Sequence, residues 1–206
     1  FGGLAVISTA TGLSKMRQNN AIDTYISHIQ IHDTNYLQYA RINDTIFQKE
    51  ELISFIKLSK FTSGLSTRIK AESFIQSAGG TSGVILNGII PSNEKNVTGI
   101  YKKLDQGNYL KNYKRKPPII ISQILSNKLN AKINTTIQCT FLNAQGESSV
   151  CLFKVVDIYN TNNSLYDEVN AFVKMEDLKE YTQLSGIHEI VIKLENEFNV
   201  ESFRSK

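Results

Sequence analysis

Apolar and polar residues alternate along several stretches of this chain, which is the pattern of β-strands with one buried face. Two such stretches, residues 66–77 and 81–90, are joined at Gly79 and Gly80, so the pattern predicts a β-hairpin. Residues 135–156 predict a second hairpin, because their apolar positions mirror each other across the turn sequence NAQG. Further strands are predicted at residues 25–33, 119–121, 169–174 and 187–194.

Other stretches carry the longer spacing of amphipathic helices. Helices are predicted at residues 48–61, near 94–104, from 122 to 130 and from 175 to 185. In the first of them Leu52, Ile53 and Ile56 fall on one side and charged residues on the other. Ser122 is the expected N-cap of the third. The turn-rich stretch 105–118, with Gly107 and two consecutive prolines, is the expected loop or joint between subdomains.

The charge and composition of the chain argue against a nucleic-acid-binding protein. A chain of 206 residues can bury a sizeable core, and its net charge is a modest +4. Residues 114–116 form the one dense basic cluster, without the basic stripe and interleaved aromatic residues of a nucleic-acid groove. Nucleic acid is therefore not an expected partner.

The beginning of the chain is apolar. Residues 1–13 carry no charge, but they are fewer than the roughly 20 residues that cross a bilayer. No basic region precedes them and no small-residue cleavage pattern follows, so a signal peptide is not predicted. A chain that begins on Phe1 within an apolar run looks like a piece cut from a longer protein. The alternative is that residues 1–13 are a buried helix.

The two cysteines flank the turn of the second predicted hairpin. With a three-residue loop at Ala144–Gly146, Cys139 and Cys151 face each other across the two strands. That arrangement permits a disulfide in an oxidising compartment. Two buried thiols that pack as small apolar side chains are the alternative.

No catalytic or cofactor-binding motif stands out. His28 and His32 lie about 13 Å apart if they share one face of a strand, too far to bind one metal ion. The glycine-rich stretch 77–83 lies between two strands rather than before a helix, so a turn is expected there and not a phosphate site. No metal, no cofactor and no ATPase, esterase or peptidase activity is expected of this chain.

A strand-to-helix joint carries the main resemblance to a known family. In GVILNGIIPSNE, residues 83–94, an apolar run is stopped by Pro91, and a polar segment with Glu94 follows. This stretch resembles the G-V-x-x-x-G-I-x-P-x-x-E segment of the periplasmic domain of lipoprotein-releasing (Lol-type) ABC transporter permeases. Those permeases are a branch of the MacB-like periplasmic core domain family.

Further segments resemble that family in the same order. Residues 4–31 look like the end of a first membrane helix and the stalk that leads into the first strand. Residues 118–141 are similar to the family's strand, helix and strand, with Asn134 where Gly-Asp is usual. Residues 153–181 resemble a later block, with Asp157 in place of a common glycine. The resemblance covers nearly the whole chain.

The resemblance implies an α+β fold of two small subdomains, each a mostly antiparallel sheet with helices packed on one face, behind an N-terminal stalk helix. Residues 1–21 would be the end of the membrane helix and the stalk, and residues 22–206 the core domain. One subdomain would be inserted in the other at about residues 67–116. Lys15 and Arg17 would then lie at the level of the lipid headgroups.

The implied function is mechanical. The chain would be a non-catalytic periplasmic domain of a permease in the bacterial inner membrane, moving lipoproteins toward a periplasmic carrier. Its partners would be a cytoplasmic ABC ATPase subunit, a second permease copy or paralogue, lipoprotein cargo and the carrier. The expected cargo contacts are Ser14, Lys15, Met16 and Arg17.

Two alternatives stay open, a MacB-type exporter of drugs or peptides and a free-standing extracytoplasmic binding module. One departure from the family bears on the carrier. Only the seven letters NAQGESS, residues 143–149, lie where a long protruding hairpin grips the carrier in one type of Lol permease. We therefore expect this chain to handle cargo more than carrier.

Overall fold

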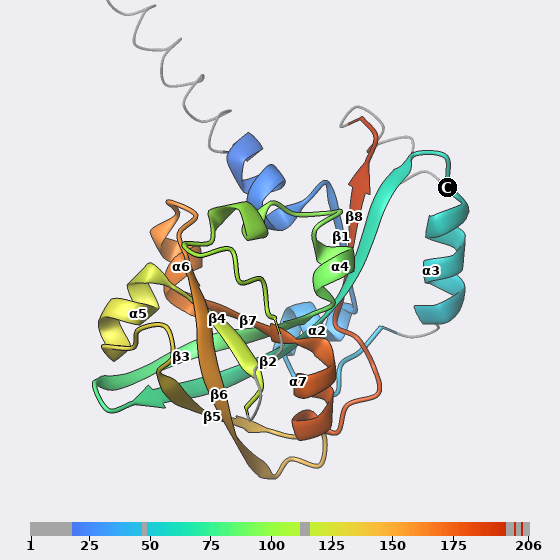
Figure 1. Cartoon of the computed structure of the whole chain (residues 1–206). Helices are drawn as coiled ribbons and strands as arrows, with labels where there is room; N and C mark the ends of the chain where they lie inside the picture. Colours follow the sequence, from blue (N-terminus) through green and yellow to red (C-terminus); the bar gives the residue numbers. More distant parts are fainter. Residues whose placement is uncertain (1–17, 47–48, 112–115, 197–199, 201–202, 204–206) are drawn as a thin grey trace, which may run out of the picture.

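The computed structural model describes residues 18–46, 49–111, 116–196, 200 and 203. The described strands all join one mixed sheet, in the order β1-β8-β2-β3-β7-β4-β6-β5. The strands are β1 (Ile29–His32), β2 (Thr62–Ser77), β3 (Gly80–Ile89), β4 (Pro118–Ser122), β5 (Thr136–Leu142), β6 (Ser148–Tyr159), β7 (Asn170–Lys174) and β8 (Glu189–Leu194). Figure 1 shows this sheet with helices around it.

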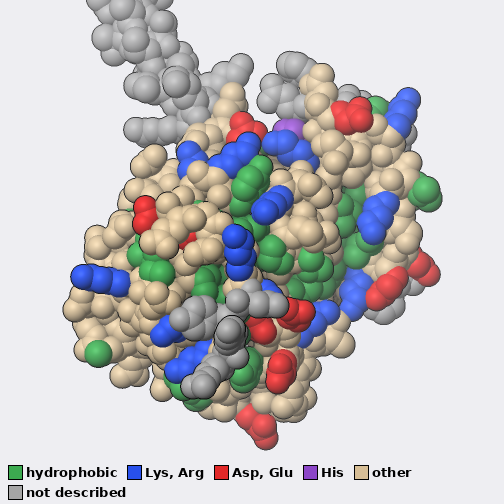
Figure 2. All heavy atoms as spheres, in the orientation of Figure 1, with side chains coloured by type: hydrophobic (Ala, Val, Ile, Leu, Met, Phe, Trp, Pro, Cys, Tyr) green, Lys and Arg blue, Asp and Glu red, His purple; other side chains and the backbone are tan. Residues whose placement is uncertain are grey.

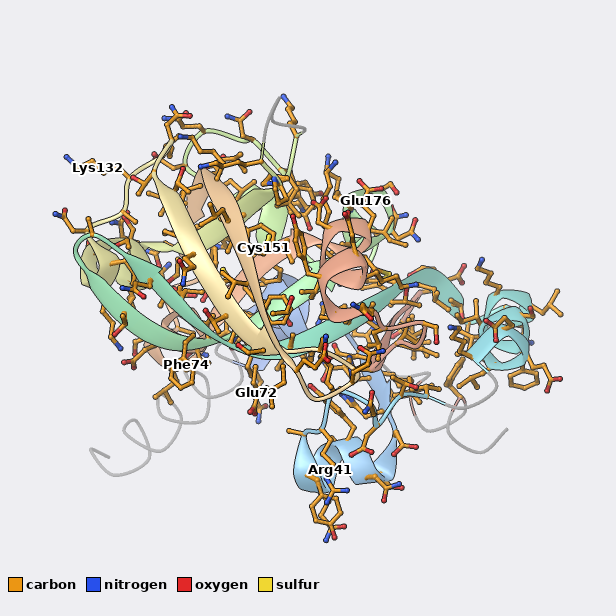
Figure 3. The ribbon with its side chains drawn as sticks, turned by 90° about the horizontal axis from the view of Figure 1, so that it is seen from below. Arg41, Glu72, Phe74, Lys132, Cys151 and Glu176 are labelled. Carbon is orange, nitrogen blue, oxygen red and sulfur yellow. The ribbon has the colours of Figure 1, made fainter. Side chains whose placement is uncertain are left out.

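Six of the strands close into a ring. β5 pairs not only with β6 but also with the second half of β2, from Ser73 to Gln76, which joins the two ends of the series β2-β3-β7-β4-β6-β5. Figure 3 shows the β5–β6 hairpin beside β2. The first half of β2 pairs instead with β8, which carries β1 at the outer edge. β2 therefore belongs to both parts of the molecule.

The α+β class is confirmed, but the arrangement of the sheet differs from expectation. Two separate, mostly antiparallel sheets were expected, whereas one sheet contains antiparallel pairs together with the parallel pairs β3–β7 and β4–β6. The reason is the length of β2, which runs from one part of the sheet into the other through the expected boundary at residue 67. The division into stalk, core and inserted subdomain stays a prediction.

Both predicted hairpins are confirmed. β2 and β3 pair in register from Arg68 with Ile89 to Ser77 with Gly80. In the second hairpin the backbone N–H of Asn143 donates to the carbonyl of Glu147 over 2.9 Å, which leaves a loop of Ala144, Gln145 and Gly146. Gly146 has a φ of 79°, the left-handed conformation that closes such a loop and that glycine adopts without strain.

Most of the described helices lie in the predicted places. They are η1 (Ile22–Ile26), α2 (Thr34–Tyr39), α3 (Lys49–Leu58), α4 (Pro91–Glu94), η2 (Ile100–Lys103), α5 (Gln123–Leu129), α6 (Ser164–Val169) and α7 (Met175–Thr182). The Ser122 side chain accepts a hydrogen bond from the Leu125 backbone N–H over 3.0 Å, which confirms the predicted N-cap. Three helices were not predicted, η1, α2 and α6, because short segments with at most two buried residues lack a clear periodicity.

The main core fills the ring. Leu125 and Leu129 from α5 and Leu178 from α7 are fully buried in the same apolar cluster as the inward residues of the strands. α7 approaches β3 closely at Gly88, where an added Cβ atom would lie 2.9 Å from the Leu178 Cδ2 atom. The glycine in the middle of GVILNGIIP is therefore required by the contact between helix and strand.

Charged side chains of both signs are scattered over the face shown in Figure 2, without a continuous basic stripe. Among the residues that the structure describes, no helix is both long enough and apolar enough to cross a bilayer.

Candidate functional site

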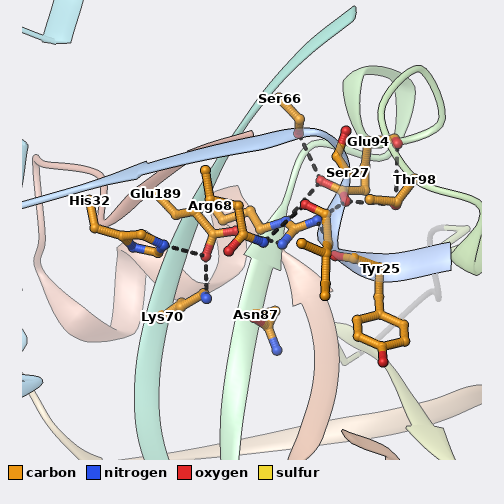
Figure 4. Close-up of polar contacts among 12 residues, drawn as sticks. Tyr25, Ser27, His32, Ser66, Arg68, Lys70, Asn87, Glu94, Thr98 and Glu189 are labelled. Carbon is orange, nitrogen blue, oxygen red and sulfur yellow. Dashed lines mark hydrogen bonds and ion pairs between the residues drawn. The ribbon is translucent and has the colours of Figure 1, made fainter. Parts of the chain in front are cut away.

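A buried arginine lies where the N-terminal segment meets the sheet. Arg68 on β2 is only 3% exposed and lies between two carboxylates, Glu94 from α4 and Glu189 from β8. Its Nη2 atom is 2.6 Å from Glu94 Oε1, and its Nη1 atom is 2.6 Å from Glu189 Oε1 (Figure 4). Burial alone would lower the pKa of Arg68, but the two carboxylates raise it above its usual value. The guanidinium is therefore charged at every pH at which the protein folds.

The sequence PSNE places Glu94 in this network. Pro91 fixes the backbone at the start of the short helix α4, and one turn later the Glu94 side chain points inward and is fully buried. Glu94 also accepts hydrogen bonds from the hydroxyls of Ser66 and Thr98, each over 2.8 Å. The strand-to-helix joint at residues 83–94, on which the family resemblance rests, is therefore the turn that places the Glu94 carboxylate beside Arg68.

Glu189 connects the arginine to two further basic groups. Lys70 on β2 forms an ion pair with it, and His32 Nε2 on β1 lies 3.8 Å from its Oε2 atom. Burial would raise the pKa of Glu189, but Arg68 and Lys70 hold it below its usual range. Glu189 is therefore ionised near neutral pH, with its charge compensated from two neighbouring strands.

The N-terminal segment is attached directly to this network. Arg68 Nη2 donates to the backbone carbonyl of Tyr25 over 3.3 Å. The Tyr25 ring stacks on Tyr166 with centroids 3.9 Å apart, and its hydroxyl accepts a hydrogen bond from Asn163. The Asp23 carbonyl accepts from the backbone N–H of Gly99 over 2.8 Å. Residues 22–32 are therefore fixed to β2, to β8 and to the turn after α4.

A buried histidine attaches the next segment. His188 is fully buried; its Nδ1 atom accepts from the backbone N–H of Lys70 over 2.9 Å. Nε2 must then carry the proton, and it donates to the Ile42 carbonyl over 2.8 Å. Burial lowers the pKa of His188, with the bond to Ile42 opposing that shift. The ring is neutral in the folded protein and binds residues 40–46 to β2.

The predicted site residues are only partly within the described residues. Ser14, Lys15, Met16 and Arg17, the expected cargo contacts, lie outside them. Among the described residues no group of three or more His, Cys, Asp and Glu side chains could hold a metal ion.

Sequence reasoning missed the Arg68 network. Arg68 lies in TRIKAES, where apolar and polar residues alternate, and Glu189 lies in HEIVIKL, which is mostly apolar. A charged residue within such a predicted strand was the available signal of a buried ion pair. The network presents no nucleophile with a neighbouring base. Its ion pairs and hydrogen bonds join β2, α4, β8 and the segment at Tyr25.

The two cysteines are direct partners in the hairpin, as the predicted register requires. Such partners have Cα atoms about 4.5–5.5 Å apart, within the range that a disulfide bridges. Both thiols are free in this structure and buried, and the disulfide stays a prediction.

We expect both reduced cysteines to react slowly with iodoacetamide in the folded protein at pH 7. Burial raises the pKa of Cys151 to about 11, and burial together with Cys151 raises that of Cys139 above its usual value. Since the thiolate is the reactive form, alkylation should wait for unfolding. Mass spectrometry with and without denaturant measures this, and rapid labelling of the native protein would contradict it.

No protein family model matches this sequence, and neither does any curated protein. Among solved structures, the chain is similar to the extracellular domain of the noncanonic ABC-type transporter YknZ from Gram-positive bacteria. That likeness has 13% identity and a TM-score of 0.52, and it covers 84% of this chain and 86% of the other.

A second likeness is to the periplasmic region of MacB from Actinobacillus actinomycetemcomitans, with 8% identity and a TM-score of 0.54, over 85% of this chain and 78% of that one. At such identities the comparisons show the fold alone. The chain has the fold of the extracytoplasmic domains of these ABC transporters.

Proposed function

We propose that this chain is a non-catalytic periplasmic domain of an ABC transporter permease that moves lipoproteins from the bacterial inner membrane toward a periplasmic carrier. The shared fold and the collinear resemblance to Lol-type permeases support the proposal. The observation that carries it is the Arg68 network, because it fixes the segment that follows the expected stalk to the sheet.

The proposed mechanism is mechanical coupling. A cytoplasmic ATPase drives the membrane helices, and the stalk passes that motion to residues 18–26, which are helical in the described part of the chain. Because the Tyr25 carbonyl accepts from Arg68 and the buried Ser27 hydroxyl donates to the Ile192 carbonyl, displacement of this helix moves β2 and β8 with it. Removing a lipoprotein from the bilayer exposes acyl chains at about 0.8 kcal/mol per CH₂ group, so coupling to ATP hydrolysis is required.

The partners follow from this mechanism. A second permease copy or paralogue faces this one, and lipoprotein passes along the surface between them. The hairpin turn at residues 143–149 is short, with a compact loop closed by Gly146, so it offers little surface to a soluble carrier.

We expect photo-crosslinkers at residues 14–17 to capture lipoprotein in the intact transporter, because the stalk lies where the cargo leaves the bilayer. Crosslinkers at residues 143–149 should capture little carrier. Lys132, which is exposed in the loop after α5, serves as the background position. Gel analysis with antibodies against both partners provides the measurement.

Strong carrier capture at the turn, with no lipoprotein at the stalk, would reverse this assignment. A drug or peptide captured at the stalk instead would place the chain with the exporters.

A further inference from the structure

A pocket of about 660 Å³ opens between α4 and α7, apart from the Arg68 network. Its apolar floor consists of Ile89, Ile90, Pro91, Leu110 and Met175. Figure 2 shows apolar side chains in this hollow, with basic side chains on more than one side. The volume is that of a pocket for a small ligand.

The backbone at Leu110 keeps the floor in place. Leu110 has a φ of 51°, a left-handed conformation that a bulky residue rarely adopts because it is strained. Its side chain is only 1% exposed, within a second apolar cluster that includes Ile89 and Tyr109. Burial in that cluster holds Leu110 in this conformation and so fixes this part of the pocket floor.

The rim of the pocket is positive. Lys111, Lys174 and Lys179 line it, and Glu176 is the one acidic residue among the described lining residues. Glu176 lies 3.3 Å from Lys174 Nζ, whereas within the described parts of the chain no acid lies within ion-pairing distance of Lys111 or Lys179. Partial burial, and then the neighbouring Lys49, lower the pKa of Lys179, so an anion beside it would be stabilised.

We propose that this pocket binds a single-chain anionic amphiphile, with its carboxylate or phosphate beside Lys111 and Lys179 and its apolar chain on the floor. The charge of the rim selects the head and the apolar floor selects the tail. A larger groove of about 1010 Å³ beside Phe74 lacks such selectivity, because charged residues of both signs, Arg41 and Lys70 with Asp44 and Glu72, line it. The pocket does not depend on the proposed transport function.

Titration calorimetry of the purified 206-residue chain with dodecyl phosphate, below its micelle concentration, tests the site. One molecule is expected to bind per chain, and its affinity should fall as salt is added. Dodecyl maltoside, which has the same tail and no charge, should bind at least about tenfold more weakly, and inorganic phosphate alone should not bind. The double variant Lys111→Gln, Lys179→Gln should lose about tenfold in affinity for dodecyl phosphate, as expected for two partly exposed ion pairs.

The variant Lys132→Gln is the matched control, because Lys132 lies far from α7 and its Glu176 in Figure 3. It should bind dodecyl phosphate like the wild type. Circular dichroism establishes that each variant is folded. The variant Ile90→Asp, at an exposed residue of the floor, should bind both amphiphiles more weakly than the wild type. Equal affinity for the two amphiphiles, an equal loss in Lys132→Gln, or no binding of dodecyl phosphate by the wild type would overturn the proposal.

Discussion

Replacing Arg68 with alanine is expected to lower the free energy of unfolding by about 3–5 kcal/mol. The side chains of Glu94 and Glu189 are both fully buried, and each has its 2.6 Å ion pair with Arg68. Without the guanidinium, Glu94 keeps hydroxyl donors but no cation among the described residues, and Glu189 keeps Lys70 and His32, so charge stays buried without full compensation. Chemical denaturation followed by circular dichroism measures the loss.

Lys193→Ala is the matched control. Lys193 Nζ pairs with Asp23 over 2.9 Å, but the Asp23 side chain is 71% exposed, and such a pair contributes about 0–1 kcal/mol. Hydrogen exchange should also become faster at residues 22–32 in Arg68→Ala than in Lys193→Ala, because Arg68 holds the Tyr25 carbonyl. A loss below about 1 kcal/mol in Arg68→Ala would show that the network does not hold the segment.

Acidification is expected to destabilise the protein in two steps. The first begins as the pH falls below 6.5, the usual pKa of histidine, since burial lowers the folded-state pKa values of His32 and His188. The unfolded chain then binds more protons than the folded one, so stability is complete above pH 6.5 and decreases as the pH falls toward the folded pKa values. Each histidine contributes a slope of up to about 1.4 kcal/mol per pH unit.

The second step begins below pH 4.5, the usual pKa of glutamate. Because Glu189 has a lowered pKa in the folded protein, its contribution is present above pH 4.5 and is lost as the pH falls through the folded value. Denaturation curves at a series of pH values would separate the steps. The double variant His32→Gln, His188→Gln should be less stable at neutral pH and should have a much flatter slope between pH 6.5 and 4.5. An unchanged slope would assign the first step to other groups.

Much of the local structure could be predicted from the sequence. The two hairpins, the amphipathic helix α3, the Ser122 N-cap and the change from strand to helix at Lys174 all depend on neighbours within a few residues. Alternation, capping and turn residues report such short-range preferences directly. The register of Cys139 with Cys151 followed from the loop length alone, since the loop fixes the pairing of a hairpin.

The order of the strands and the Arg68 network were decided only by the tertiary structure. No periodicity says that β5 returns to β2, or that β3 and β7 run parallel, because those pairings depend on how whole elements pack around one core. Arg68 and Glu189 are 121 positions apart, and either could have been an exposed charge on a strand. Alternation specifies which face of a strand is buried, but not which distant strand supplies the partner of a buried charge. That choice is made when β2, β8 and α4 meet, since a buried arginine is stable only where carboxylates from other elements surround it.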